Sequence, residues 1–151
     1  MPTTLLWFRR DLRLADHPAL VAAAGRGAVI PVFIHDNSVD TLGAAPKWRL
    51  DRGLDAFDAQ LRGQGHRLIL RRGPAREVLE ELVEETGADA VYWSRLYDPE
   101  AIERDARVKA ALQENGIDAQ SFVGHLIHEP WEIETQQGGP YRVYSPFWKN
   151  A

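Results

Sequence analysis

Short apolar runs alternate along the chain with longer segments of helical periodicity. The runs are continuous, without interleaved polar residues, which is typical of parallel strands buried on both faces of a sheet. We expect five such strands, at residues 4–8, 28–34, 67–70, 90–93 and 119–123. Because parallel neighbours need long crossover connections, the pattern predicts strands that alternate with helices.

The segments between the runs carry apolar stripes at helical spacing. One stripe consists of Leu50, Leu54, Phe57 and Leu61, and another of Val78, Leu79, Leu82 and Val83. Asp16 and the Asp98-Pro99 pair are typical of helix starts, because the carboxylate can accept from free amides and proline fits the first turn. Glycines 65, 87 and 116 predict helix ends.

These elements predict an α/β fold of the Rossmann-like, three-layer α/β/α type. Right-handed crossovers would give a five-stranded parallel sheet, for which we expect the strand order 3-2-1-4-5. Such sheets bind ligands at the carboxyl ends of their strands, near the switch in strand order. We therefore expect a site among residues 9–11, 35–36, 71–73, 94–98 and 124–125.

The pattern changes after the fifth strand. Residues 125–151 are rich in proline, glycine and aromatic side chains and show no clear periodicity. We expect residues 1–124 to form one domain. We expect residues 125–151, called the connector below, to be a loop without a helix that leads to a further domain beyond the chain.

Composition narrows the classes of function. Of the 151 residues, 44% are hydrophobic and 26% are charged, which is typical of a globular domain. The chain has no cysteine, which excludes disulfides and thiolate metal sites. No signal peptide and no apolar run long enough for a bilayer are visible, so we expect a cytoplasmic protein without a membrane partner. The net charge of −4 indicates that this domain is not the main DNA-binding surface.

Several common catalytic and nucleotide motifs are absent. The first strand–helix junction lacks the Gly-x-Gly-x-x-Gly pattern, and the chain has neither a P-loop nor a Gly-x-Ser-x-Gly elbow. Ordinary dinucleotide binding and hydrolase chemistry are therefore disfavoured. His125 and His128 lie in a loop without further clustered ligands, and we predict no metal site.

Two junctions carry candidate chemistry. Residues 7–13, Trp-Phe-Arg-Arg-Asp-Leu-Arg, place three arginines around one aspartate. This cluster can bind an anion or form a network of buried ion pairs. Residues 97–100, Tyr-Asp-Pro-Glu, can serve as a helix cap alone or can also face a ligand crevice.

Two separated motifs resemble the photolyase/cryptochrome family. The first is Leu6-Trp-Phe-Arg-Arg-Asp-Leu-Arg-Leu-Ala-Asp-His-Pro-Ala-Leu20, and the second is Gly139-Pro-Tyr-Arg-Val-Tyr-Ser-Pro-Phe-Trp-Lys149. The middle of the chain agrees in layout, including Ala90-Val-Tyr-Trp93. Within the motifs, the structural residues of the family correspond to Arg10, Asp11, Arg13, Tyr141, Pro146 and Phe147.

The resemblance implies a two-domain parent protein. Its helical C-terminal domain, absent here, carries FAD and acts on damaged DNA, and it would be the partner of this domain. The parent would be a DNA photolyase, a carbon–carbon lyase that uses light to split pyrimidine dimers, and we expect these 151 residues alone to be inactive. The alternatives are a cryptochrome-type photoreceptor domain and a stand-alone nucleotide-binding module.

The resemblance also implies an antenna pigment in this domain, either a methenyltetrahydrofolate or a deazaflavin. Carried onto this chain, the pigment-binding candidates are Arg9, Phe33, Asp36, Tyr97, Glu100 and Ala101. Folate-binding members commonly carry an Asn-Glu pair early in the fourth predicted helix, where this chain has Glu100 and Ala101. The sequence therefore leaves the identity of the pigment open.

Overall fold

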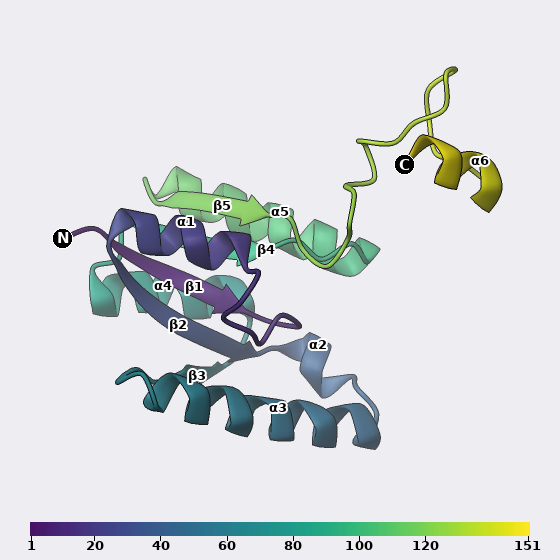
Figure 1. Cartoon of the computed structure of the whole chain (residues 1–151). Helices are drawn as coiled ribbons and strands as arrows, with labels where there is room; N and C mark the ends of the chain where they lie inside the picture. Colours follow the sequence, from purple (N-terminus) through teal and green to yellow (C-terminus); the bar gives the residue numbers. More distant parts are fainter.

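The computed structural model describes residues 1–151, which form five strands and six helices (Figure 1). The strands are β1 (Thr3–Phe8), β2 (Ala28–His35), β3 (Ile69–Arg72), β4 (Ala90–Ser94) and β5 (Asp118–Phe122). The helices are α1 (Pro18–Arg26), α2 (Asn37–Asp40), α3 (Ala44–Arg62), α4 (Ala75–Thr86), α5 (Pro99–Glu114) and α6 (Tyr144–Asn150). None of the helices is both long and apolar enough to cross a membrane.

All neighbouring strands are parallel, in the order β3-β2-β1-β4-β5. The predicted strand order is thereby confirmed. The third strand begins at Ile69, two residues later than the sequence predicts, because its ladder with β2 starts at the pair Val32–Ile69. Leu68 is buried, but its backbone N–H donates to the carboxylate of Asp58 at 2.8 Å instead of joining that ladder.

Side chains alternate between the two faces of the sheet and create two cores. Leu5 and Trp7 of β1 join a cluster with buried residues of α4 and α5, whereas Leu6 and Phe8 join a cluster with residues of α1 and α3. Each helix pair therefore covers one face, which confirms the three-layer prediction. Within α3, Phe57 and Leu61 of the predicted apolar stripe are buried.

The expectation that all five strands are buried on both faces was wrong for the two edge strands. In β3 the side chain of Leu70 is 56% exposed, and in β5 Ala119 alone is buried. An edge strand has a neighbour on one side only and packs against fewer helices. The three central strands carry most of the buried strand side chains.

The helices end close to the predicted glycines, but the two predicted caps at helix starts do not form as expected. Helices α3, α4 and α5 end at Arg62, Thr86 and Glu114, within three residues of the predicted positions. The prediction that Asp16 caps α1 was wrong. Asp16 has φ 51°, outside the extended conformation of a capping residue, and His17 accepts the N–H of Leu20 instead.

Asp98 stands at the predicted cap position of α5, followed by Pro99, yet its side chain makes no capping hydrogen bond. Its carboxylate lies 3.2 Å from Arg10 instead.

Two short helices were missed from the sequence. Helix α2 is a single turn after β2, begun by Asp36, which accepts the backbone N–H of Ser38 at 2.9 Å. Helix α6 lies in the connector, where no helix was expected. Because α6 has no buried residue, no apolar stripe marks it in the sequence. In Figure 1 the connector leaves the end of β5 and places α6 away from the sheet.

The turn after β1 is held by a pair of polar side chains, Asp11 and His17. Nδ1 of His17 accepts from Leu20, so Nε2 carries the proton and lies 2.9 Å from a carboxylate oxygen of Asp11. The other carboxylate oxygen accepts the backbone N–H of Arg9 at 2.9 Å. Burial raises the pKa of Asp11, but hydrogen bonds from His17, Ser94 and the Arg9 backbone outweigh it and lower this pKa to about 2. The pair fixes the backbone that carries Arg9 and Arg10.

Replacing Leu79 by alanine tests the core formed by α4. Leu79 is fully buried, so Leu79→Ala should lower the free energy of unfolding by about 2–5 kcal/mol in urea denaturation. Leu70→Ala on the exposed edge strand is the control and should cost less than about 1 kcal/mol. Equal losses in the two variants would contradict this assignment of the core.

The hydrogen-bonded carboxylate of Asp11 should make a pH-dependent contribution to the free energy of unfolding. Because the pKa of Asp11 falls from its ordinary 3.8 to about 2, the ionised group should stabilise the fold above pH 4 by about 2 kcal/mol. The contribution is lost as pH falls through the folded pKa, so the stability gap between wild type and Asp11→Asn should shrink from about pH 5 to about pH 2. Urea denaturation at several pH values measures the difference in free energy of unfolding between wild type and Asp11→Asn. A difference that does not change with pH would refute the stabilising role of the Asp11 carboxylate.

Candidate functional site

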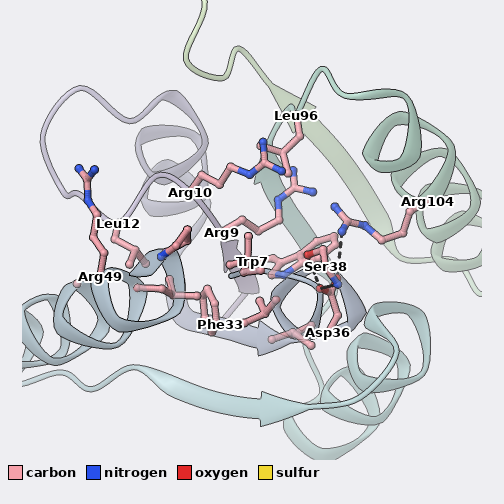
Figure 2. Close-up of a pocket in the computed structure, with 16 residues that line it drawn as sticks. Trp7, Arg9, Arg10, Leu12, Phe33, Asp36, Ser38, Arg49, Leu96 and Arg104 are labelled. Atoms are coloured by element: carbon pink, nitrogen blue, oxygen red, sulfur yellow. Dashed lines mark hydrogen bonds and ion pairs between the residues drawn. The ribbon is translucent and has the colours of Figure 1, made fainter. Parts of the chain in front are cut away.

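A cavity of about 480 Å³ opens at the carboxyl ends of β1 and β2 (Figure 2). Trp7 and Arg9 come from the end of β1, and Phe33 and Asp36 from the end of β2. Helices α2 and α3 supply a further wall, while Leu96 of the β4–α5 turn and Arg104 of α5 reach the cavity from across the switch in strand order. This is the position at which parallel α/β sheets bind ligands.

One side of the cavity is apolar. Its wall is built from Leu12, Phe33, Val39, Leu42, Pro46, Leu50 and Leu96. Helix α3 places Gly53 in this wall, where an added Cβ would lie 3.6 Å from the Leu12 side chain, an ordinary contact distance. A small side chain would therefore fit at Gly53, whereas a large one would extend along the cavity wall beside Leu12.

A chain of ion pairs runs along the floor of the cavity, and three of its four members, Arg9, Arg104 and Asp36, line the cavity. Arg9 lies 2.6 Å from Asp105, and Asp105 lies 2.9 Å from Arg104. Arg104 in turn reaches Asp36 at 3.0 Å, an interaction drawn in Figure 2. The guanidinium of Arg9 also donates to the backbone carbonyl of Ser94. The two arginines and two carboxylates thus tie together the ends of β1, β2 and β4 and helix α5.

Both floor arginines lie against the indole ring of Trp7. The guanidinium carbon of Arg9 is 4.4 Å from the ring centroid, and that of Arg104 is 5.3 Å away. Burial lowers the pKa of Arg9, whereas the neighbouring Asp105 acts in the opposite direction. Arginine stays protonated in proteins, so the floor holds two fixed positive charges balanced by two carboxylates.

Two further arginines give the rim of the cavity a surplus of positive charge. Arg10 is 60% exposed at its side chain and lies 3.2 Å from Asp98, a contact that water largely screens. Arg49 of α3 is exposed and takes part in no ion pair. In Figure 2 Arg49 and Arg10 stand on either side of Leu12. The rim can therefore receive an anionic group.

The structure brings together some of the predicted pigment-binding residues and separates the others. Arg9, Phe33 and Asp36 line the cavity. Tyr97 does not, because Leu96 is the residue of that turn that faces it. Glu100 is exposed and Ala101 is buried within α5, and neither lines this cavity. From the β4–α5 turn, Leu96 lines this cavity, and pigment binding by Tyr97, Glu100 and Ala101 stays a prediction.

Tyr97 lines a second cavity, of about 540 Å³, beneath the connector. Its walls include Trp93, Arg95, Lys109 and Trp131. The two cavities lie on opposite sides of Leu96, which lines both.

Among the residues of the first cavity that the sequence did not predict are Ser38, Arg49, Gly53 and Arg104. Arg49 and Gly53 lie on α3, one turn apart, so helical spacing already placed them near each other. Nothing in the sequence indicated that this part of α3 passes the ends of β1 and β2. Arg104 sits in the second turn of α5, where no local motif marks it.

The family-motif residues have local structural roles. Arg10 pairs with Asp98, and Arg13 donates to the backbone carbonyl of Asp16 at 3.1 and 2.9 Å. In the connector, the rings of Tyr141 and Phe147 meet edge to face at 6.3 Å, and Pro146 lies within α6. No group of three or more histidine, aspartate or glutamate side chains is placed to hold a metal ion.

Comparisons with known proteins agree on one family. The family model for DNA photolyase matches residues 4–151. A deoxyribodipyrimidine photo-lyase of Agrobacterium fabrum is 47% identical over 96% of this chain and 30% of its own length. Cryptochrome-2 of Arabidopsis thaliana is 38% identical over 98% of this chain and 25% of its own length.

Solved structures give the same result. A bacterial class III photolyase from Agrobacterium tumefaciens has a TM-score of 0.93 and 46% identity, covering 98% of this chain and 31% of its own. An archaeal photolyase from Sulfolobus tokodaii, described with two FAD molecules and an implied novel light-harvesting cofactor, has a TM-score of 0.77 and 30% identity over 88% of this chain and 32% of its own. The match extends over both the sheet and the connector, and the chain belongs to the DNA photolyase family.

Proposed function

We propose that this chain is the N-terminal light-harvesting domain of a deoxyribodipyrimidine photolyase. The observation that supports the proposal most directly is the cavity at the strand ends, which combines an apolar wall with an arginine-rich rim. A planar, conjugated and anionic pigment matches both features. The pigment would absorb light and pass its excitation on, while the protein supplies binding and orientation.

The chemistry of repair lies outside these residues. The chain spans about a third of the length of the curated relatives that it matches. Under the proposal, the remaining part of the protein would form the helical FAD-binding domain, bind damaged DNA and perform the lyase reaction. The net charge of −4 supports a minor role of this domain in DNA binding.

The cavity fits the proposed pigment in shape and charge. Phe33, Leu12 and Leu50 offer apolar surface for a ring system, and Gly53 adds no side chain to this wall. Trp7 lies at the floor of the cavity with its ring covered by the guanidinium groups of Arg9 and Arg104. Arg10 and Arg49 would bind a carboxylate, phosphate or phenolate group. A methenyltetrahydrofolate, a deazaflavin and a flavin all have such rings and anionic groups.

A cryptochrome-type photoreceptor is the second candidate function. It is favoured by the 38% identity to an Arabidopsis cryptochrome over 98% of this chain. The light-harvesting cavity would serve either kind of parent protein, because the proposed repair chemistry lies elsewhere. Repair of pyrimidine dimers by the longer protein would separate the two functions.

Filling the cavity from α3 tests its role. Gly53→Phe places a ring beside Leu12, and it should lower the affinity for the pigment at least about tenfold, equivalent to ~1.4 kcal/mol. Methenyltetrahydrofolate, 8-hydroxy-5-deazaflavin and FMN would each be titrated and followed by fluorescence. Gly25→Phe is the matched control, because Gly25 lies on α1 with open space around it. Binding that is unaffected by Gly53→Phe would place the pigment elsewhere.

Reversing the charge at Arg49 tests the anionic character of the pigment. Arg49→Glu should weaken binding of the same pigment about tenfold, the effect of losing one hydrogen bond to a charged group. Arg52→Glu is the control, since Arg52 lies on the same helix, pairs with Asp51 and Asp55, and does not line the cavity. Equal effects of the two variants would indicate a general charge effect instead of a contact.

A further inference from the structure

Glu129 is the one buried residue of the connector. Its side chain is 3% exposed, whereas every other residue from 125 to 151 is at least partly exposed. A buried carboxylate is costly unless it is paired and hydrogen-bonded. The burial of Glu129 therefore needs an explanation beyond the packing of an otherwise exposed segment.

The partners of Glu129 come from the turn between β4 and α5. Arg95 donates to one carboxylate oxygen of Glu129 from Nε at 2.9 Å and from Nη2 at 2.8 Å. The hydroxyl of Tyr97 donates to the same oxygen at 3.0 Å. Arg95 is itself fixed by the backbone carbonyl of Ser121, which accepts from Nη1 at 2.8 Å. Three side chains thus fasten the connector to the α/β unit.

Gly124, the residue before the connector, lies in direct backbone contact with the same turn. A Cβ at Gly124 would collide with the backbone oxygen of Arg95 and would lie 3.1 Å from the Tyr97 ring. Its N–H donates to the Tyr97 hydroxyl at 3.1 Å. Only glycine at position 124 allows the backbone to pass this close to Arg95. The contact between the two segments therefore depends on this glycine as well as on the ion pair between Arg95 and Glu129.

The other side of this turn forms part of the pigment cavity. Leu96 lies between Arg95 and Tyr97 in the sequence and lines the cavity. Asp98, at the end of the turn, contacts Arg10 on the cavity rim at 3.2 Å. Within residues 95–98, Arg95 and Tyr97 therefore hold the connector, whereas Leu96 lines the cavity wall and Asp98 contacts the rim.

We propose that Glu129 is a positioning residue that couples the course of the connector to the wall of the pigment cavity through residues 95–98. The proposal rests on the light-harvesting function above, in which the connector leads to the part of the protein that receives the excitation. Anchoring at Glu129 fixes the direction in which the chain leaves the pigment-binding unit. If release of the anchor weakens pigment binding, thermodynamic linkage requires that pigment binding strengthen the anchor by the same free energy.

Hydrogen exchange measured by mass spectrometry on the 151-residue chain tests the coupling. Tyr97→Phe removes the hydroxyl that joins Glu129 to Gly124, and Glu129→Gln weakens the ion pair with Arg95. Both variants should raise exchange about tenfold in residues 124–133 and also in residues 95–104 and 9–13, as expected for one lost hydrogen bond to a charged group. Exchange in the strand cores of β1 and β2 should stay unchanged.

Matched controls make the same chemical changes outside the anchor. Tyr141→Phe and Glu134→Gln alter connector side chains that form no hydrogen bond or ion pair, and they should leave all these segments unchanged. A rise confined to residues 124–133, a uniform rise over the whole chain, or no rise would each overturn the coupling. A uniform rise would show that the residues act on global stability alone.

Pigment titration of Tyr97→Phe separates this inference from the proposed function. If wild type binds 8-hydroxy-5-deazaflavin or methenyltetrahydrofolate, the variant should bind the same pigment at least about threefold more weakly. Equal affinities would overturn the coupling while leaving the light-harvesting function intact. If wild type binds neither pigment nor FMN, the proposed function fails, and the exchange pattern alone decides whether residues 95–98 transmit the change.

Discussion

The ion-pair chain Arg9–Asp105–Arg104–Asp36 is the interaction on which the candidate site depends. Its four side chains come from β1, from α5 and from the residue after β2, and they meet at one edge of the sheet. Arg9 and Asp36 are buried, so each needs its partner: leaving one such charge unpaired costs about 3–5 kcal/mol. The chain thereby fixes the spacing between α5 and the strand ends, and this spacing gives the cavity its floor.

This floor explains why the site needs no glycine-rich phosphate loop. The charges of Arg9 and Arg104 are balanced by carboxylates, so they shape the cavity more than they attract a ligand. Arg10 on the rim is weakly paired with Asp98, and Arg49 has no ion pair. These two arginines would therefore attract an anionic ligand. The apolar wall beside them suits a ring system instead of a pyrophosphate. Of the two alternatives that the sequence left open for the arginine cluster after β1, the buried ion-pair network is confirmed for Arg9. Anion binding at Arg10 stays a prediction.

The sequence predicted the fold well because buried strands and helical stripes have distinct periods. The strand order, the three layers and the residues at the ends of β1 and β2 all follow from that pattern and the family motifs. The prediction failed where local sequence carries no signal of three-dimensional position. Tyr97 and Leu96 are adjacent in the turn after β4, yet Leu96 lines both cavities and Tyr97 lines the second cavity alone. Arg104 is brought in by helix docking, and α6 has no buried face to mark it.

A crystal structure of the chain with a bound pigment tests the central claim most directly. Crystals would be grown with 8-hydroxy-5-deazaflavin and, separately, with methenyltetrahydrofolate. Our account predicts density for the ring against Phe33 and Leu50, in the space beside Gly53, with its anionic group near Arg10 or Arg49. Density in the cavity lined by Tyr97 and Trp131, with the first cavity empty, would contradict it.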